Sequence, residues 1–507
     1  MTFGELLNLV SSDKVPGICV DSRLIKAGDI FVAIEGTVYD GHDFIDQAVA
    51  NGAKYIVCQQ REASYVRREQ GHKGTKLTQY AIRNTQYEII IVDDSAEAAA
   101  FLAQARRGNP ASQLTNLAVT GTNGKTTVAF LVRSCIQKAG KKCGLISTII
   151  YDTCSATSEA ALTTPDCLAI AERQEQIVKA GSKYMVIEAS SHALSQNRLA
   201  AINFEAAAFT NLAGDHLDYH KTREDYLAAK TKLFSLLSPD AKAVLNKQSQ
   251  EAKRIAGKTK AKTLWYAVDA PSDITAHIES MNIGGTVFVL EYAGQREKVN
   301  TPLLGRYNVS NSLAAAGLCL AAGFDLETIA AGLSALRTIP GRLEKLDGDG
   351  VSVFIDYAHT DDALRNVLST LKPFCKGRLT VVFGCGGDRD RTKRPRMARV
   401  AEELADCVIV TSDNPRTERP ADIINEIVAG FKNPNSQTIT IEPDRKKAIE
   451  LAIKNADKDD IVLIAGKGHE TYQIIGKQKH DFSDKEVAEK CLKKRIRDKE
   501  SDANCTH

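Results

Sequence analysis

The residues best suited to phosphate chemistry lie together in one short stretch, 121–127. It follows an apolar run, 117–119, and precedes an apolar segment with helical spacing, 125–138. Glycines in such a loop let backbone N–H groups point at phosphate oxygens, and the positive end of a helix strengthens the attraction. A lysine there can reach the β- and γ-phosphates, and a threonine hydroxyl can bind Mg²⁺. The stretch predicts a nucleotide phosphate site made by Gly121, Thr122, Asn123, Gly124, Lys125, Thr126 and Thr127.

Two further observations bear on this site. Val119 stands where the usual motif has its first glycine, so a purely structural turn is the alternative interpretation. Glu188 follows the apolar run 184–187, where a carboxylate is well placed to hold Mg²⁺ on a γ-phosphate. For Glu188 the alternative is an ordinary surface glutamate.

Another cluster of polar residues follows the strand predicted at 206–210. Metal binding, phosphate binding and a plain loop are all open for Asp215, His216, Asp218 and His220.

Charged or glycine-rich loops follow four predicted strands in the last third of the chain. They begin at Asp356, Gly384, Asp413 and Gly466. Because the carboxyl ends of parallel strands meet at one edge of a sheet, these loops predict a ligand crevice there. Arg389 and Arg416 suit planar carboxylates, which a guanidinium binds with two parallel hydrogen bonds. Asp413 and Glu470 suit an ammonium group, so the loops predict an amino-acid substrate with more than one carboxylate.

The segments around these motifs predict an α/β protein. A length of 507 residues allows about three domains, each with its own core. Residues 1–112 predict a small α/β domain. Residues 113–337 predict a P-loop domain with a mainly parallel sheet, and residues 338–507 predict a Rossmann-like, doubly wound domain, because apolar runs alternate with helical segments in both.

Particular elements follow from the same patterns. In the first domain, strands are expected at 30–34, 55–58 and 89–92, with a helix over 95–107 that Ser95 would cap. In the second, we expect strands at 117–120, 143–147, 184–188, 206–210 and 242–245, helices at 125–138, 222–237 and 313–322, and a hairpin at 285–303. In the third, strands are expected at 351–356, 378–384, 407–411, 437–441 and 461–465.

Composition narrows the class of protein. Apolar content of 43% and charged content of 25% are ordinary for a globular protein, and a net charge of +3 argues against general nucleic-acid binding. The twelve cysteines include no Cys-x-x-Cys pair, which fits a reducing compartment. The first residues lack the pattern of a signal peptide, and no run of about 18 apolar residues occurs. We therefore expect a cytoplasmic protein without a membrane span.

Together the motifs resemble those of the Mur ligases, the ATP-dependent amide-forming enzymes of peptidoglycan synthesis. Within this family, the chain is most similar to the ligases that attach meso-2,6-diaminopimelate to UDP-N-acetylmuramoyl-L-alanyl-D-glutamate. The resemblance spans nearly the whole chain. It rests on Asp-Ser-Arg (21–23), Asp-Gly-His (40–42), the loop 121–127, Thr-Thr-Pro (163–165), Glu-Ala-Ser-Ser-His-Ala-Leu (188–194), Asp-His-Leu-Asp-Tyr-His (215–220), Gly-Arg-Tyr-Asn-Val-Ser-Asn (305–311), Asp-Tyr-Ala-His-Thr (356–360), Asp-Asn-Pro-Arg (413–416) and Gly-Lys-Gly-His-Glu (466–470).

The resemblance implies a role for residues that spacing alone would not select. The UDP end of the substrate would lie near Ser22, Thr37, Val38 and Tyr39. The muramoyl-dipeptide would contact Thr163, Thr164, Ser190, Gln196 and Arg198. The nucleotide would also contact Asn308, Arg342 and Asp356, and Mg²⁺ would be held by Thr126, Glu188 and His216. The incoming amino acid would be bound by Arg389, Asp413, Asn414, Pro415, Arg416, Gly466 and Glu470.

The resemblance also implies the catalytic groups and the reaction. Lys125 and His216 would be catalytic, together with Lys230, which matches a lysine that is carbamylated in the family. On its own pattern, Lys230 is a solvated lysine of an amphipathic helix. The implied reaction forms an acyl phosphate and ADP, with ATP and Mg²⁺ as cofactors. We expect the protein to be a monomer. Three alternatives remain: the same ligase adding L-lysine, a folylpolyglutamate-type ligase, and a nucleotide-gated binding protein without ligase activity. Arg419 replaces a common acidic residue, and we expect it to face solvent.

Overall fold

The computed structural model describes residues 1–12, 17–36, 39–60, 87–214 and 217–504, apart from the side chains of residues 217, 218 and 498–504. The chain forms two compact units, and each is assembled from several segments. Unit 1 comprises Met1–Ala118, Lys141–Ala207 and Ala229–Ala241. Unit 2 comprises Val119–Gly140, Ala208–Ala228 and Lys242–His507. Within the part of the chain that the structure describes, no helix is both long and apolar enough to cross a membrane.

Unit 1 begins with a four-stranded parallel sheet of order β1-β2-β3-β4. Its strands are β1 (Ile18–Cys19), β2 (Ile30–Val32), β3 (Tyr55–Gln59) and β4 (Glu88–Val92). Successive side chains of β2 enter different cores, because neighbouring residues of a strand point to opposite faces. Ile30 and Val32 pack with α1 (Phe3–Val10) and α4 (Ser95–Arg106), whereas Phe31 packs with α2 (Ile45–Ala50).

The start of α4 corrects one expectation. The residue that caps this helix is Asp94 and not Ser95, because the Asp94 carboxylate accepts the Glu97 N–H at 2.9 Å. Ser95 is buried as the first helical residue. A carboxylate caps the N-terminus as well as a hydroxyl does and adds a favourable charge there.

The rest of unit 1 carries strands of the central sheet and two helices. In order β9-β6-β7-β8, the strands are β9 (Tyr184–Glu188), β6 (Gly144–Ile146), β7 (Ile150–Asp152) and β8 (Thr157–Glu159). β6 and β9 are parallel, and the two short strands after them are antiparallel. The helices are α6 (Cys167–Lys179) and α7 (Ser191–Ser195). β5 (Thr115–Thr120), β10 (Phe204–Phe209) and α9 (Arg223–Ser235) contribute residues to both units.

Unit 2 contains the other central strands in the order β11-β12-β13-β14-β15. They are β11 (Lys242–Asn246), β12 (Lys262–Val268), β13 (Ile274–Asn282), β14 (Gly285–Tyr292) and β15 (Gln295–Thr301). The pairs from β11 to β13 are parallel, and the hairpin β14–β15 is antiparallel, as predicted. The helices are α5 (Lys125–Lys138), α8 (Leu217–His220), α10 (Gln250–Ala256), α11 (Arg306–Ala321) and α12 (Leu326–Ala335).

Two features of this region differ from expectation. β12 and β13 were not predicted, since their polar and apolar residues are mixed. The helix predicted at 313–322 is α11, which begins seven residues earlier at Arg306. Its first turns are polar, so they lack an apolar helical pattern, but Asn308, Asn311 and Ser312 are buried there and hydrogen-bonded.

The last part of unit 2 is a six-stranded sheet of order β16-β17-β21-β18-β19-β20. Its strands are β16 (Glu344–Gly348), β17 (Val351–Asp356), β18 (Leu379–Phe383), β19 (Cys407–Val410), β20 (Ile439–Ile441) and β21 (Ile461–Ala465). All pairs except β16–β17 are parallel. α13 (Asp361–Leu371), α14 (Lys393–Leu404) and α15 (Pro420–Val428) share one core with Phe354 and Val381. α16 (Arg445–Lys454) and α17 (Asp484–Asn504) share the other core with Val353 and Val382.

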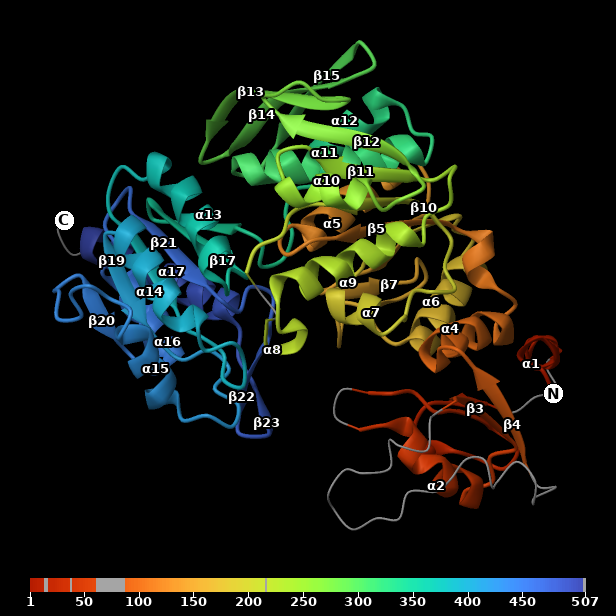
Figure 1. Cartoon of the computed structure of the whole chain (residues 1–507). Coiled ribbons are helices and arrows are strands. Elements are labelled where there is room, and N and C mark those ends of the chain that lie inside the picture. Colours follow the sequence, from red (N-terminus) through yellow and green to blue (C-terminus); the bar gives the residue numbers. More distant parts are fainter. Residues whose placement is uncertain (13–16, 37–38, 61–86, 215–216, 505–507) are drawn as a thin grey trace. The chain divides into compact units, whose positions relative to one another are not determined.

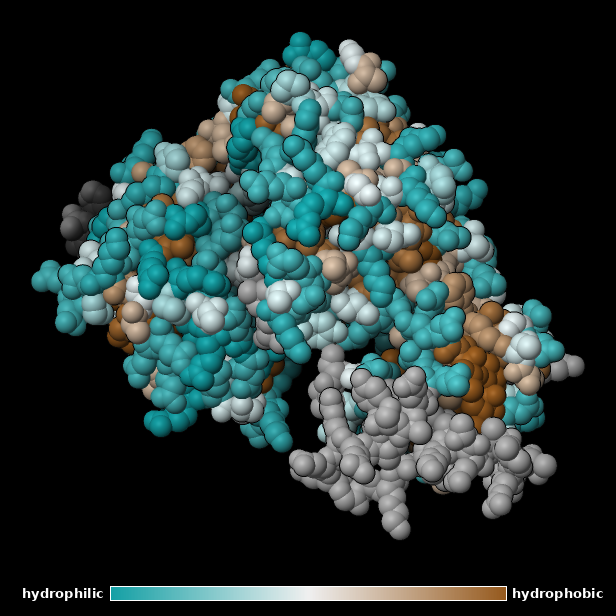
Figure 2. Space-filling view, in the orientation of Figure 1, coloured by the Kyte–Doolittle hydropathy of each residue, from teal (hydrophilic) through white to brown (hydrophobic). Residues whose placement is uncertain are grey.

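Helices therefore cover both faces of this sheet, which is the doubly wound arrangement (Figure 1). A short hairpin of β22 (Tyr472–Ile475) and β23 (Gln478–Asp481), which was not predicted, follows β21. The α/β fold class is confirmed, and the bounds of α5, β17 and β21 are those predicted. The domain limits at residues 112 and 337 stay predictions. The face drawn in Figure 2 is mainly hydrophilic and carries scattered apolar residues.

Candidate active site

The phosphate loop connects β5 to α5 and is shaped by two glycines with positive φ. Gly121 has φ of 148° and Gly124 has φ of 90°. A Cβ on Gly121 would lie 1.9 Å from Thr210 Oγ1, and one on Gly124 would lie 2.3 Å from Asn311 Oδ1. Both positions therefore require glycine, for their backbone conformation and for lack of space. The predicted strand, glycine loop and helix are present.

Residues from outside the loop hold its backbone in place. Asn211, the second residue after β10, accepts the Thr122 N–H through its carbonyl at 2.9 Å and the Asn123 N–H through its side chain at 3.0 Å. The Thr210 hydroxyl donates to the Asn123 carbonyl at 2.6 Å. The Asn123 side chain donates to Asp362 at the start of α13, at 2.9 Å. The loop is thus fixed from several directions at once.

Two cations lie at the start of α5. The Lys125 ammonium donates to the carbonyls of Gly121 and Thr122, at 2.9 and 2.8 Å. Arg342 donates to the Thr126 hydroxyl at 3.0 Å, and its guanidinium lies 4.5 Å from the centre of the Tyr357 ring. The structure therefore brings Arg342, predicted near the nucleotide, to the phosphate loop.

The other predicted nucleotide residues, Asn308 and Asp356, are buried in unit 2. The Asn308 amide donates to the Leu304 carbonyl at 2.7 Å and accepts from Asn311 at 3.0 Å. Asp356 closes β17 and accepts the N–H groups of Leu343 and Ala358, at 2.6 and 2.8 Å. Burial raises the pKa of Asp356 to about 6, although the Arg342 guanidinium and these two N–H groups oppose the rise.

A second cluster of predicted residues lies in unit 1, around the end of β9. Glu188 is fully buried and accepts the N–H and the hydroxyl of Thr148, at 2.8 and 2.9 Å. The Thr148 hydroxyl also lies 3.1 Å from the Thr163 hydroxyl. Thr148 was missed in the sequence, where its one signal is that it directly follows the strand predicted at 143–147.

The remaining predicted residues of this cluster contact one another. The Thr164 hydroxyl donates to the Glu188 carbonyl at 2.6 Å and accepts the Ser190 N–H at 3.0 Å. Arg198 donates to the Thr164 carbonyl at 2.7 Å and to the Gln196 side chain at 2.7 and 3.1 Å. Residues predicted to contact the muramoyl-dipeptide thus share one network with a predicted Mg²⁺ ligand.

The structure describes only some of the remaining predicted residues. Ser22 is buried in the short 3₁₀ helix Ser22–Leu24, and its hydroxyl donates to Gln47 at 2.8 Å. The Tyr39 side chain is 73% exposed and makes an edge-to-face contact with Phe44. Thr37, Val38 and His216 lie outside the described residues, and so does Asp215.

The position of Lys230 decides between its two interpretations. It lies in α9, and its side chain is only 1% exposed. A solvated helix lysine would project into water, so the solvated interpretation is wrong. A fully buried ammonium is costly unless a partner or a chemical change compensates its charge.

The loops after β17, β18, β19 and β21 meet at one edge of the doubly wound sheet, because these strands are parallel neighbours. The Asn414 side chain donates to Glu470 at 2.8 Å and accepts from the buried Lys467 ammonium at 3.1 Å. Lys467 also binds Glu470 at 3.0 Å. Burial would raise the pKa of Asp413, yet the charges of Lys467 and Arg445 hold it below its ordinary value. Asp413 and Glu470 therefore supply carboxylates at the site.

Arg416 is fixed in an unusual backbone conformation. Its φ is 50°, and its N–H and carbonyl bond to Ile474 and Gly476 of the β22–β23 hairpin, at 3.1 and 2.7 Å. Its guanidinium donates to the Gly387 carbonyl at 2.7 Å and is only partly buried. Arg389 is exposed on the neighbouring loop. Gly466, with φ of 117°, leaves no room for a Cβ, which would lie 2.7 Å from Asp413 Oδ2.

Comparison with known proteins fits this geometry. The family model for the Mur ligase middle domain matches residues 119–319, that for the glutamate ligase domain of Mur ligases matches residues 341–468, and that for the Mur ligase family catalytic domain matches residues 14–107. The UDP-N-acetylmuramoyl-L-alanyl-D-glutamate–2,6-diaminopimelate ligase of Gloeobacter violaceus is 43% identical over 484 residues, which are 95% of this chain and 94% of that protein. The chain belongs to the Mur ligase family.

Solved structures agree with this membership. The solved structure of another UDP-N-acetylmuramoyl-L-alanyl-D-glutamate–2,6-diaminopimelate ligase is 31% identical in sequence, with a TM-score of 0.64 over 95% of each chain. A folylpolyglutamate synthase of Mycobacterium tuberculosis has a TM-score of 0.60 but 20% identity, over 72% of this chain and 91% of that one. That likeness is one of fold alone. The predictions of the Mur ligase family and of an ATP-dependent ligase class are confirmed.

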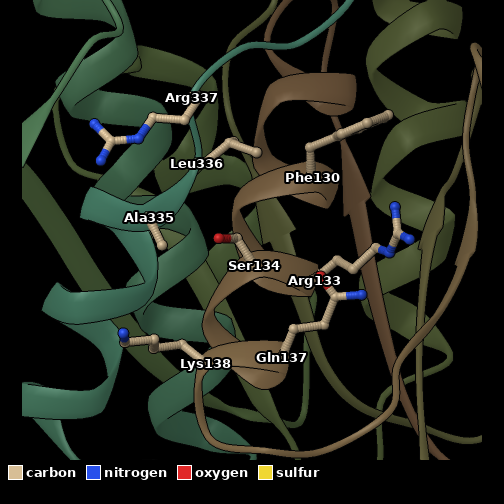
Figure 3. Close-up of a pocket in the computed structure, with 8 residues that line it drawn as sticks. All are labelled: Phe130, Arg133, Ser134, Gln137, Lys138, Ala335, Leu336 and Arg337. Atoms are coloured by element: carbon tan, nitrogen blue, oxygen red, sulfur yellow. The ribbon is translucent and has the colours of Figure 1, made fainter.

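One cavity of this Mur ligase lies away from the described site. It has a volume of about 380 Å³ and lies along the later turns of α5, beside the end of α12 (Figure 3). Its lining includes Phe130, Arg133 and Gln137 of α5 and Leu336 and Arg337 after α12. The phosphate loop is at the other end of α5, so this cavity is not the phosphate site.

Proposed function

We propose that this Mur ligase joins meso-2,6-diaminopimelate to UDP-N-acetylmuramoyl-L-alanyl-D-glutamate, with ATP converted to ADP and phosphate. The observation that carries the proposal is that the Arg416 guanidinium and the Asn414–Lys467–Glu470 cluster lie on loops at one edge of the same sheet. A substrate with an ammonium and two carboxylates complements these charges. The name of the Gloeobacter relative supports the same substrates.

In the proposed reaction, a free carboxylate of the D-glutamyl residue attacks the γ-phosphate of ATP and forms an acyl phosphate and ADP. The amine of diaminopimelate then attacks the acyl carbon and expels phosphate. The protein contributes chiefly by holding the reactants and by placing positive charge where negative charge develops. Lys125 and the N–H groups at the start of α5 supply that charge to the phosphates, whereas the Thr122 and Asn123 N–H groups bond to Asn211. Asn308, Arg342 and Asp356 hold the nucleotide.

The donor chemistry of the chain fits Mg²⁺. The Thr126 hydroxyl and the Glu188 carboxylate are hard oxygen donors, and Mg²⁺ is usually held by one or two carboxylates together with substrate phosphates. Among the described residues, no group of three or more His, Cys, Asp or Glu forms a metal site by itself. We propose Thr126, Glu188 and His216 as its ligands. When bound, Mg²⁺ neutralises charge on the phosphates.

The acceptor substrate is assigned to unit 1. Ser22, Thr37, Val38 and Tyr39 are proposed for its UDP end, and Thr163, Thr164, Ser190, Gln196 and Arg198 for its muramoyl-dipeptide. The contacts of Thr163 and Thr164 around Glu188 support this assignment, since the D-glutamyl carboxylate must approach the transferred phosphoryl group. Because ATP and UDP-linked precursors belong to the cytoplasm, we propose that the protein is cytoplasmic. We also propose that it acts as a monomer.

One assay tests the reaction. The purified protein is supplied with ATP and Mg²⁺, and ADP release is measured with and without the UDP-muramoyl-dipeptide and an amino acid. We expect ADP release only when both are present, and a kcat/KM for meso-diaminopimelate at least about 30-fold above that for L-lysine. Equal values, or a preference for lysine, would contradict the substrate. Activity with a folate and L-glutamate instead would favour the folylpolyglutamate alternative.

Lys230 is proposed to carry a carbamate. Its burial supports this, because a fully buried ammonium is costly and carbamylation replaces it with an anion that can assist Mg²⁺. We expect Lys230→Ala to lose roughly 100-fold or more in kcat, by analogy with loss of a positioned charge, and to be partly rescued by formate or acetate. Lys232→Ala, on the same helix, is the matched control. With ¹³C-bicarbonate, the wild-type protein should show a carbamate signal that Lys230→Ala lacks, and an active alanine variant would contradict the role.

A further inference from the structure

A buried ion pair joins the two loops that carry Arg416 and Arg389. Arg394, in the first turn of α14, is 0% exposed. It donates to both carboxylate oxygens of Glu418, at 2.8 and 2.9 Å, and to Glu426 at 2.8 Å. It also donates to the Gly386 carbonyl at 3.2 Å. One side chain of α14 therefore contacts both the loop after β18 and the loop after β19.

Glu418 fixes the loop after β18 by a second route. Its carboxylate accepts the Asp388 N–H at 2.6 Å. The Asp388 carboxylate in turn accepts the N–H and the hydroxyl of Thr417, at 3.1 and 2.7 Å. Asp388 and Arg416 both have positive φ, 52° and 50°, which non-glycine residues adopt only where surrounding contacts hold them. The two loops thus hold each other in strained conformations.

These contacts reach the Arg416 guanidinium through Gly386 and Gly387. The Gly387 carbonyl accepts from Arg416 at 2.7 Å, and the Gly387 N–H donates to the Asn414 carbonyl at 2.9 Å. A Cβ on Gly386 would lie 2.9 Å from the Arg416 guanidinium, so the fit is close. A displacement of this glycine pair must therefore move the guanidinium.

Arg394 is not itself available to a substrate. It is wholly buried, and its Nη1 and Nη2 groups donate to two glutamates and a carbonyl. Hydrogen bonds from Arg394 lower the pKa of Glu418 to about 2, so the pair stays ionised at any pH at which the enzyme would be assayed. Its role must be exerted through the groups that it holds.

We infer that Arg394 and Glu418 are a positioning pair that sets the preference for a dicarboxylic amino acid by fixing the direction of the Arg416 guanidinium. The inference rests on the proposed function, since it assumes that Arg416 binds the second carboxylate of diaminopimelate. L-Lysine lacks that carboxylate, so it does not depend on where the guanidinium points. Loss of the pair should therefore weaken one substrate and spare the other.

Glu418→Gln tests this, because glutamine keeps the shape of the side chain but turns one acceptor oxygen into a donor facing Arg394. The values measured are kcat/KM for meso-diaminopimelate and for L-lysine, and KM for ATP. We expect a loss of about tenfold to 100-fold for diaminopimelate, as for a displacement of about 1 Å. The value for lysine should stay within about threefold, by the same reasoning, and KM for ATP should not change.

Glu403→Gln is the matched control. Glu403 accepts two hydrogen bonds from Arg365, at 2.9 and 2.8 Å, but this pair joins α13 to α14 on the surface. The control should leave all three values unchanged. Arg394→Lys is a second variant, which keeps the charge and loses the two-pronged contact, and it should show the same selective loss if Glu418→Gln does not fold.

Two outcomes would overturn the inference. An equal loss for both amino acids would show that the pair is only structural, and no loss for either would show that it has no role. A wild-type enzyme that did not prefer diaminopimelate would contradict the proposed function instead. That result is read before any variant is made, so the two failures are distinguishable.

Discussion

The phosphate loop and the amino-acid loops are built in different ways. The phosphate loop is one continuous segment, 121–127, whose conformation depends on two glycines and the start of α5, and Thr210, Asn211 and Asp362 then hold it in place. The amino-acid loops come from four strands spread between residues 351 and 465, and each is held by residues of another. A local backbone conformation depends on residues that are adjacent in the sequence. A network of charges depends on which strands lie next to each other in the folded sheet.

Lys125→Ala tests the phosphate loop. We expect ADP formation to fall at least about 1,000-fold, because the variant lacks a charge aimed at the transferred phosphoryl group. The fold should remain, since the Lys125 ammonium donates to carbonyls of its own loop. Turnover and the circular dichroism spectrum check this. Lys138→Ala, at the exposed far end of α5, is the control, and retention of more than a tenth of wild-type turnover by Lys125→Ala would refute the assignment.

Arg416→Ala tests the assembled site. Losing one partner of a buried charge pair costs on the order of 2–5 kcal/mol, so kcat/KM for diaminopimelate should fall about 30-fold to several thousand-fold. KM for ATP should not change, because Arg416 bonds to Gly387 and to the β22–β23 hairpin and we assign it to the amino acid. Arg419→Ala is the control: its side chain is 81% exposed, which confirms that it faces solvent. A parallel rise in KM for ATP would show that the two regions are not independent.

Asp356, the last residue of β17, gives the smallest effect. The charge of Arg342, which donates to Thr126 of the phosphate loop, acts on its carboxylate. Its pKa is raised to about 6 from 3.8 by burial, against the opposing charge of Arg342. The folded protein therefore takes up this proton at higher pH than the unfolded chain, and the contribution of Asp356 to stability improves as pH falls from about 6 to 4. Its proposed contact with the nucleotide weakens over the same range.

The measurement is KM for ATP as a function of pH. Between pH 7.5 and 5.5 we expect KM to rise about fourfold, because the deprotonated fraction of a group with a pKa of about 6 falls about fourfold over this range. Asp356→Asn should be weaker throughout and should lack this dependence. An unchanged pH profile in the asparagine variant would assign the titration to another group.

The sequence predicted the elements that depend on local pattern. The bounds of α5, β17 and β21 agree with prediction because their apolar periods are unbroken. The cap of α4 was misassigned because Asp94 and Ser95 are both good capping residues, and only the Asp94–Glu97 bond decides between them. The start of α11 was missed since its buried asparagines are stabilised by contacts and not by pattern.

By itself, the sequence determined the phosphate loop, the α/β fold class and the residue types of the amino-acid site. Glycine conformation, apolar period and side-chain chemistry act within a few residues. The tertiary structure alone decided that Lys230 is buried, that Thr148 holds Glu188, and that Arg394 joins two loops. Burial and ion pairing depend on distances between segments far apart in the chain. No local pattern encodes those distances, so they are defined only when the sheets have formed.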